Sequence, residues 1–389
     1  MNKSKKEELA KTVQGAHLSL KTTEPTLFGH GWISGVLGLG LSMLGFGAVL
    51  CFHFPSLLTM PELRNVYPLP YVRATLHLVL VGGFFFGTIS ILLRQNKAFG
   101  LSAIFLVLIS AVLGGSRIPI DEVKQGPLLG MDWFLLNLLL FSAVCVPLER
   151  LFALRPDQPT FRFGWKADLT YFFVNSMLVQ ITTLLTLFPA TVLFRWAVNS
   201  GVQQWVSELP LAVQVAGVLF CADLTQYWVH RLFHTVPALW KFHAIHHSAE
   251  KMDWLAGARL HLIDVVVTRG LSYVPIFVLG FSDTAMIAYA VMVTIQATLI
   301  HANVRWDFSW VRWLLVTPRY HHWHHSAEKE AIDKNFAVHV PFWDWLFGTY
   351  YMPGDRWPDS YGISGDSKVP SGFFRQLLYP FAALFRRSD

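Results

Sequence analysis

The chain has 389 residues, of which 53% are hydrophobic and only 14% are charged. This composition excludes an ordinary soluble protein, in which about a quarter of the residues are charged, and it predicts an all-α, polytopic membrane bundle. The net charge of +6 does not indicate nucleic-acid binding, because the basic residues flank apolar stretches, where they suit anionic membrane lipids.

The N-terminal part of the chain contains a basic tail, residues 1–30, with five lysines and no long apolar run. Four apolar stretches follow and predict a four-helix membrane extension over residues 31–155. The first is too long for a signal peptide and lacks a clear cleavage site, so it is interpreted as a retained span. The four stretches are residues 32–52, 71–93, 99–113 and 133–146.

A polar loop, Arg155-Pro156-Asp157-Gln158-Pro159, marks the boundary with a predicted catalytic domain, residues 156–355. This domain begins with two further apolar stretches. The first, residues 169–198, is either one tilted span or a broken pair, and the second covers residues 211–229. The C-terminal tail, residues 356–389, combines aromatic residues with arginines, which suits either an interfacial anchor or a disordered segment.

The charges of the loops orient the spans. With the N-terminus in the cytoplasm, the segments on that side carry eleven lysines and arginines, against five in the opposite loops. Lysine and arginine accumulate on the cytoplasmic side of membrane proteins. Six spans then place residue 230 at the cytoplasmic face.

Eleven of the sixteen histidines lie within residues 230–325, and most of them are clustered. Residues three and four positions apart share one face of a helix, so each cluster presents a compact set of imidazoles. Four protein ligands are enough for a structural zinc ion and three for a catalytic one. Eight helix-spaced histidines therefore predict two metal ions. The eight are His230, His234, His243, His246, His247, His321, His324 and His325.

The apolar stretch between the clusters, residues 263–300, is interrupted by Gly280-Phe281-Ser282-Asp283. Glycine with a polar neighbour is typical of a turn, so the stretch predicts a helical hairpin. A hairpin returns His301 to the side of the membrane that carries His247. The alternative is a single tilted span, which would place His301 on the opposite side.

The order of these motifs resembles the fatty acid hydroxylase and sterol desaturase superfamily. The resemblance rests on HxxxH, HxxHH, a lone histidine and HxxHH, followed by Asn335-Phe336 and Trp343-Asp344-Trp345-Leu346-Phe347-Gly348-Thr349. It covers residues 165–352, about half of the chain. The stretch Ile332-Asp333-Lys334-Asn335 is similar to alkylglycerol monooxygenase and its bacterial relatives.

The resemblance implies two iron ions that activate dioxygen to hydroxylate or desaturate a lipid. It also implies that His301 is a ninth ligand. Together with the loop charges, the resemblance predicts a protein of a bacterial inner membrane whose active site faces the cytoplasm. No haem or dinucleotide motif is present, so a separate protein must donate electrons. Imidazole alone does not distinguish iron from zinc. The substrate is open between an ether lipid, a fatty acyl chain and a sterol-like lipid, with oxygen insertion favoured over desaturation.

Three other residues are candidate catalytic residues. Asp223 lies two helical turns before His230, so its carboxylate is predicted to support a histidine, against the alternative of a structural hydrogen bond. Tyr227 lies between them, and Asn335 either hydrogen-bonds the site or caps a helix. His322 points away from its cluster and is excluded as a ligand, whereas the ligand role of His261 is left open.

A second class of function also agrees with the sequence. A non-catalytic membrane protein that carries metal or binds lipid would retain the same histidine clusters without redox turnover. Metal transport requires ligands along a path through the bilayer, whereas these histidines cluster beside the ends of spans. The sequence therefore favours the lipid oxygenase.

Overall fold

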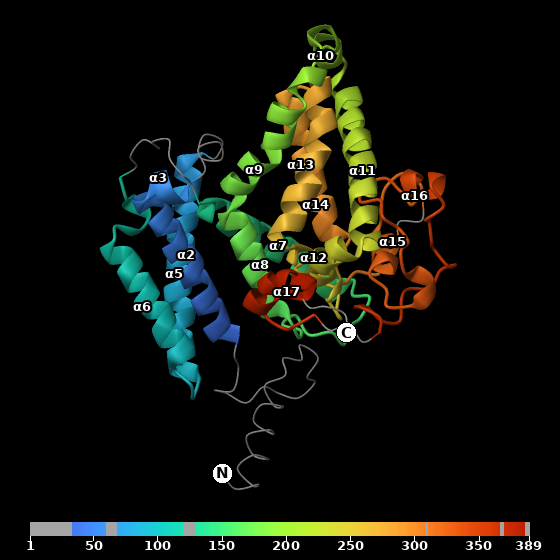
Figure 1. Cartoon of the computed structure of the whole chain (residues 1–389). Helices are drawn as coiled ribbons and strands as arrows, with labels where there is room; N and C mark the ends of the chain where they lie inside the picture. The colour runs from blue at the N-terminus through green and yellow to red at the C-terminus, as the bar shows by residue number, and fades with distance from the viewer. Residues whose placement is uncertain (1–32, 60–67, 120–128, 308–309, 366–368, 386–389) are drawn as a thin grey trace. The chain divides into compact units, whose positions relative to one another are not determined.

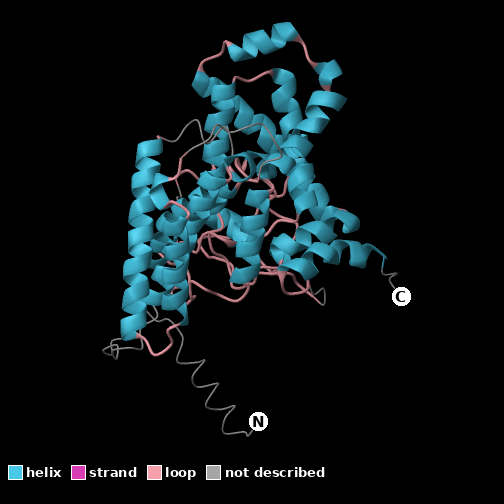
Figure 2. Ribbon diagram, turned by 90° about the vertical axis from the view of Figure 1, so that its left-hand side faces the viewer, coloured by secondary structure: helices cyan, strands magenta, loops and turns pink. Residues whose placement is uncertain are grey.

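The computed structural model describes residues 33–59, 68–119, 129–307, 310–365 and 369–385 (Figure 1). The predicted basic tail, residues 1–30, lies outside them. Helices and connecting loops make up the described residues, and Figure 2 shows no strand among them. The predicted all-α fold class is confirmed.

The chain divides into two compact units. The first comprises residues 1–137 and 157–161, and the second comprises residues 138–156 and 162–389. The predicted domains, residues 31–155 and 156–355, stay predictions.

Close packing of small residues holds the first unit together. A Cβ atom added to Gly38 of α2 would lie 2.7 Å from the backbone nitrogen of Gly87 in α5, and one added to Gly100 of α6 would lie 2.7 Å from the Gly87 carbonyl oxygen. Small residues allow membrane helices to approach closely where the hydrophobic effect does not drive association. The elements are α2 (Ile33–His53), α3 (Pro55–Leu58), α5 (Leu69–Leu93), α6 (Ala98–Val112), η1 (Gly115–Arg117) and the start of α7 (Met131–Leu151).

Three long helices of the second unit, α11, α13 and α14, run from the end of the unit near α10 to the end that carries α12 and α15, and the shorter α9 packs against α13 (Figure 1). The helix α11 packs against α12, α13 and α14. After α7, the elements are α8 (Trp165–Met177), α9 (Val179–Phe188), η2 (Pro189–Leu193), η3 (Arg195–Ala197), α10 (Ser200–Ser207), α11 (Leu211–Thr235), α12 (Pro237–His247), η4 (Ala256–Ala258), α13 (Leu262–Leu279), α14 (Asp283–Leu299), α15 (Pro318–His324), η5 (Lys329–Ala331), α16 (Phe342–Leu346) and α17 (Phe373–Phe385).

Five of the described helices are long and apolar enough to cross a membrane. The stretch 169–198 is a broken pair, because Trp165–Met177 and Ile181–Leu193 are bent by 69°. The helix α11 has 25 residues but is not among the five, so its predicted span stays a prediction. The chain is an integral membrane protein. The five are Ile33–His53, Leu69–Leu93, Ala98–Arg117, Met131–Leu151 and Leu262–Leu279.

The predicted hairpin is confirmed. The helix α13 ends at Gly280, which has a φ angle of 73°, and the side chain of Ser282 caps the start of α14. Glycine adopts this left-handed conformation without the steric cost that a Cβ atom imposes. The turn brings the chain back, so that the Nε2 atoms of His301 and His246 lie 3.3 Å apart. A single tilted span is excluded.

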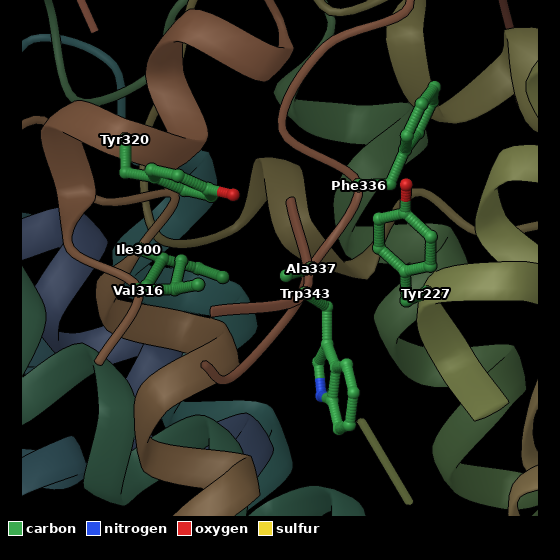
Figure 3. Close-up of a cluster of buried hydrophobic side chains, with 7 residues drawn as sticks. All are labelled: Tyr227, Ile300, Val316, Tyr320, Phe336, Ala337 and Trp343. Atoms are coloured by element: carbon green, nitrogen blue, oxygen red, sulfur yellow. The ribbon is translucent and has the colours of Figure 1, made fainter. Parts of the chain in front are cut away.

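A buried apolar cluster holds the loop after η5 against α11 (Figure 3). In Figure 3 Ala337 lies between Tyr227 on one side and Ile300 and Val316 on the other. The Asp344 carboxylate accepts hydrogen bonds from the backbone nitrogens of Phe336 and Ala337, at 2.8 and 2.6 Å. The loop is therefore fixed beside the histidines of α11.

Candidate metal centre

Nine buried or nearly buried histidines gather in two groups in the second unit. Within each group, the ligand nitrogens all lie within 4.8 Å of one another. The structure thus brings together every histidine that was predicted to bind metal. Group A comprises His230, His234, His243, His247 and His324, and group B comprises His246, His301, His321 and His325.

Helical spacing explains how the groups separate. His243 and His247 are four residues apart on α12 and face group A, whereas His246 lies about a hundred degrees from its neighbour His247 and faces group B. The helix α15 divides its histidines in the same way between the two groups. Two short helices therefore supply ligands to two adjacent sites.

The distances between nitrogens fit metal coordination. The Nε2 atoms of His230 and His243 lie 3.0 Å apart, and those of His301 and His321 lie 2.9 Å apart. Nitrogens bound to one ion at about 2.0–2.1 Å are roughly 2.9–3.4 Å from one another in tetrahedral or octahedral geometry. The Nε2 atoms of His234, His247 and His324 are buried and have no hydrogen-bond partner among the described residues. Such buried polar atoms are rare unless a ligand satisfies them.

The second nitrogen of four group A histidines faces an acceptor. The Nδ1–H of His243 donates to Asp264 at 2.7 Å, and that of His230 donates to the Phe336 carbonyl at 2.7 Å. His324 donates to the Lys334 carbonyl at 2.8 Å, and Asp333 lies 3.4 Å from His234. A second-shell acceptor fixes the orientation of a ligating imidazole and raises its basicity. All four are therefore held with Nε2 available to an ion.

Backbone carbonyls orient two histidines of group B. His301 donates to the Ala297 carbonyl at 2.7 Å, and His246 donates to the Arg259 carbonyl at 3.2 Å. Gly257 packs against His301 so closely that an added Cβ atom would lie 2.8 Å from its Nδ1. The segment around η4 thus positions two ligands.

A buried ionic cluster anchors this segment. Arg162 bonds to both oxygens of Asp253 and to Asp168, each at 2.7 Å. The Arg259 guanidinium bonds to the second oxygen of Asp168. Because every charge in the cluster is paired and hydrogen-bonded, its burial is tolerated, and removal of one partner would leave an uncompensated charge.

Burial keeps the imidazoles neutral. Desolvation lowers the pKa of His247, His324 and His325 well below the usual value of 6.5, and neighbouring histidines lower it further. It lowers the pKa of His301 to about 4. The neutral imidazole has the free lone pair that a metal ion requires.

The three candidate catalytic residues lie around the loop of residues 335–340. Asp223 accepts hydrogen bonds from three backbone nitrogens, those of residues 338–340, and bonds to no histidine side chain among the described residues. Tyr227 is hydrogen-bonded to Thr349 at 2.9 Å. Asn335 has a φ angle of 58° and donates to the carbonyls of Tyr320 and Tyr351. All three support the backbone that holds His230 and His324.

His322 and His261 lie outside both groups. The ring nitrogens of His322 face the Tyr361 hydroxyl at 2.8 Å and the Ala302 carbonyl at 3.1 Å. His261 accepts a hydrogen bond from the backbone nitrogen of Ile263 and donates to the Leu377 carbonyl. Neither has a nitrogen left for a metal ion.

Two positioning residues were missed from the sequence, Asp264 and Arg259. Asp264 is an acidic residue at the start of an apolar stretch, and acidic residues within such stretches are rare and usually functional. Arg259 acts through its backbone carbonyl, for which the sequence carries no signal.

Comparison with known proteins places this site in a family. A family model described as fatty acid hydroxylase matches residues 215–349, which include all nine histidines. Ornithine lipid hydroxylase OlsE of Rhizobium tropici is 30% identical over 266 residues, which cover 66% of this chain and 77% of that protein. The chain belongs to the fatty acid hydroxylase family. The resemblance found in the sequence is thereby confirmed.

Two further relatives match shorter parts of the chain. Human alkylglycerol monooxygenase is 29% identical over 163 residues, which cover 42% of this chain and 35% of that protein. The zebrafish (Danio rerio) alkylglycerol monooxygenase is 28% identical over 162 residues, again 35% of its length. No solved structure matches the chain significantly.

Proposed function

We propose that this protein is a membrane-bound dinuclear iron oxygenase that hydroxylates a lipid, using dioxygen and electrons from a separate donor protein. The observation that carries the proposal is the division of nine histidines into two groups, each with nitrogens spaced for one ion. A relative named as a lipid hydroxylase and relatives named as monooxygenases support the reaction class.

Iron is preferred because the proposed reaction is a redox reaction. Zinc has no redox chemistry, although it binds to imidazole and can occupy the site in purified protein. Two iron ions bound in groups A and B would activate dioxygen for removal of hydrogen from an unactivated C–H bond. The residues of the chain bind these ions, fix the imidazoles and exclude bulk water from the site.

We also propose that the histidine groups face the cytoplasm of a bacterial inner membrane. The excess of lysine and arginine in the loops assigned to that side supports this orientation. A cytoplasmic site is accessible to a reduced electron carrier, and a site beside the ends of spans is accessible to lipid. Oxygen insertion is preferred over desaturation because the relatives reported above are named as a hydroxylase and as monooxygenases.

The test combines metal analysis with isotope labelling. The purified protein should contain two iron ions per chain, and cells that express it should incorporate ¹⁸O from ¹⁸O₂ into a membrane lipid or an aldehyde released from it. The His246→Ala variant should abolish this label, whereas His322→Ala, which leaves both groups intact, should retain it. If new double bonds appeared in a lipid without any ¹⁸O label, the enzyme would be a desaturase and not a hydroxylase. If no lipid product appeared at all, the oxygenase proposal would be excluded.

A further inference from the structure

Arg269 places a positive charge within α13, one of the apolar helices that can cross the membrane. An arginine keeps its charge under all physiological conditions, and charged residues inside membrane helices are rare and usually mark a functional site. Neither the metal centre nor the described packing of the second unit uses this guanidinium.

The face of α13 that carries Arg269 points into the bundle. Tyr273 and Ile276, four and seven residues further along the same face, pack against α11 and α14. Val265, four residues before Arg269, is buried as well. Arg269 is nevertheless exposed. An exposed side chain between buried neighbours on an inward face indicates accessible space next to the guanidinium.

The carboxylates of α11 and α13 that lie in the bundle, Asp223 and Asp264, already have partners. Asp264 accepts from His243 and Thr268, and Asp223 accepts from three backbone nitrogens. No hydrogen bond or ion pair joins the Arg269 guanidinium to any residue that the structure describes. Tyr289 of α14 interacts with it electrostatically and accepts a hydrogen bond from Gln226 of α11 at 3.2 Å. Arg269, Tyr289 and Gln226 therefore form a polar layer in the bundle, and among the described residues no carboxylate pairs with the guanidinium of this layer.

We infer that Arg269 binds the anionic group, a carboxylate or a phosphate, of the lipid on which the enzyme acts. The guanidinium donates hydrogen bonds in a planar arrangement that matches both groups. Desolvation inside an apolar bundle strengthens such a charged contact. This inference deepens the proposed function and relies on it for the reaction, but binding of the anion does not depend on metal or dioxygen.

The position of this layer also predicts where the lipid reacts. Gln226 lies four residues, about 6 Å along α11, before His230, and Arg269 lies five residues, about 7.5 Å along α13, after Asp264, which bonds to His243. A lipid whose anionic group binds at Arg269 presents the first carbons of its chain to the histidines. Oxygen is therefore inserted near the anionic end of the chain and not at its far end.

The test measures binding to the full-length protein in a neutral maltoside detergent, without reductant, so that no turnover occurs. The probes are palmitate, hexadecyl phosphate, the uncharged hexadecanol and inorganic phosphate. Palmitate or hexadecyl phosphate should bind and raise the melting temperature. Arg269→Gln should weaken that binding at least about tenfold, the loss expected from one charged hydrogen-bonded contact, and leave hexadecanol binding unchanged. Arg375→Gln, a change of an exposed arginine on α17, should have no effect.

Several outcomes would overturn the inference. They are unchanged palmitate binding in Arg269→Gln, an equal loss of hexadecanol binding, or an equal stabilisation by inorganic phosphate alone. An Arg269→Gln variant that melts below the wild type, or that fails to fold, would show that the protein itself compensates the charge, and would overturn it too. These binding measurements do not depend on metal or dioxygen, so their result would stand even if the protein were shown not to be an oxygenase.

Discussion

Groups A and B differ in how the protein holds their imidazoles. In group A, two carboxylates and the backbone of residues 334–336 orient the rings, so four of the five rings have their own acceptor. In group B, the carbonyls of Ala297 and Arg259 orient two rings, while the Nδ1 atoms of His321 and His325 have no partner among the described residues.

This difference shows that two adjacent metal sites can depend on separate parts of the fold. Group A depends on the carboxylates of Asp264 and Asp333 and on the carbonyls of Lys334 and Phe336, which lie next to it. Group B depends on backbone segments, one of which is fixed by the ionic cluster of Arg162, Asp168, Asp253 and Arg259. Each site should therefore lose its ion independently of the other when its own support is removed.

The largest effect should come from removing a ligand of the smaller group. His321→Ala leaves three histidines in group B and five in group A, so the metal content should fall from two ions per chain to one. Lipid hydroxylation should fall by more than about a hundredfold, since loss of a ligand exceeds the effect of losing its outer support. Elemental analysis and product assays measure both. The adjacent His322→Ala serves as control, and retention of two ions in His321→Ala would contradict the division into groups.

Removing a carboxylate that orients a ligand should have a smaller effect. Asp264→Asn replaces the acceptor of the His243 Nδ1–H with an amide of the same size. The affinity of group A should fall about 10–100-fold, as for other carboxylates behind a ligating histidine, while group B keeps its affinity. Competition with a chelator would resolve the two affinities. Asp283→Asn, at the exposed start of α14, should change neither, and an equal loss from both groups would count against separate supports.

The histidine clusters could be recognised from the sequence because helical spacing is local. Positions such as His243 and His247 share a face for reasons that involve only their own helix, and the turn at Gly280 separates two helices for an equally local reason. The return of His301 to the side of His247 then followed from the condition that both must reach one site, whereas the pairing of His301 with His246 comes from the structure.

The residues that orient the imidazole rings were harder to predict, because they reach the histidines only through tertiary contacts. Asp223 carries the sequence signal of a histidine partner, yet its carboxylate is bonded to the backbone of residues 338–340, more than a hundred positions away in the chain. Asp264 fulfils the expected role instead. Both are acidic residues on largely apolar helices, and only the fold determines which one reaches a ring.

A backbone change should perturb group B moderately. In Gly257→Ala the new Cβ atom would lie 2.8 Å from Nδ1 and 3.1 Å from Cγ of His301, so the ring must shift. The affinity of group B should fall about tenfold, the lower end of the effect of disturbing a ligand's surroundings. Gly40→Ala, where no atom lies within 4 Å of the new Cβ, is the matched control. An unchanged group B in Gly257→Ala would show that the ring has room to move.

The smallest effect should come from His261, the histidine that the sequence could not assign. Its Nδ1 accepts from the backbone nitrogen of Ile263 at 3.1 Å and so caps α13, and its Nε2–H donates to the Leu377 carbonyl of α17 at 3.2 Å. His261→Ala should remove both bonds and lower the free energy of unfolding by about 1–2 kcal/mol, the usual cost of a lost cap with one further hydrogen bond.

Both ions should remain in His261→Ala, because neither nitrogen of His261 lies in group A or group B. Thermal unfolding together with elemental analysis distinguishes a histidine that caps a helix from one that binds a metal ion. A cap lowers the melting temperature and leaves two ions, whereas a ligand removes one ion. Loss of an ion in His261→Ala would mean that the ligand set extends beyond the nine histidines of the two groups, and that the His261 ring turns toward the centre when metal is bound.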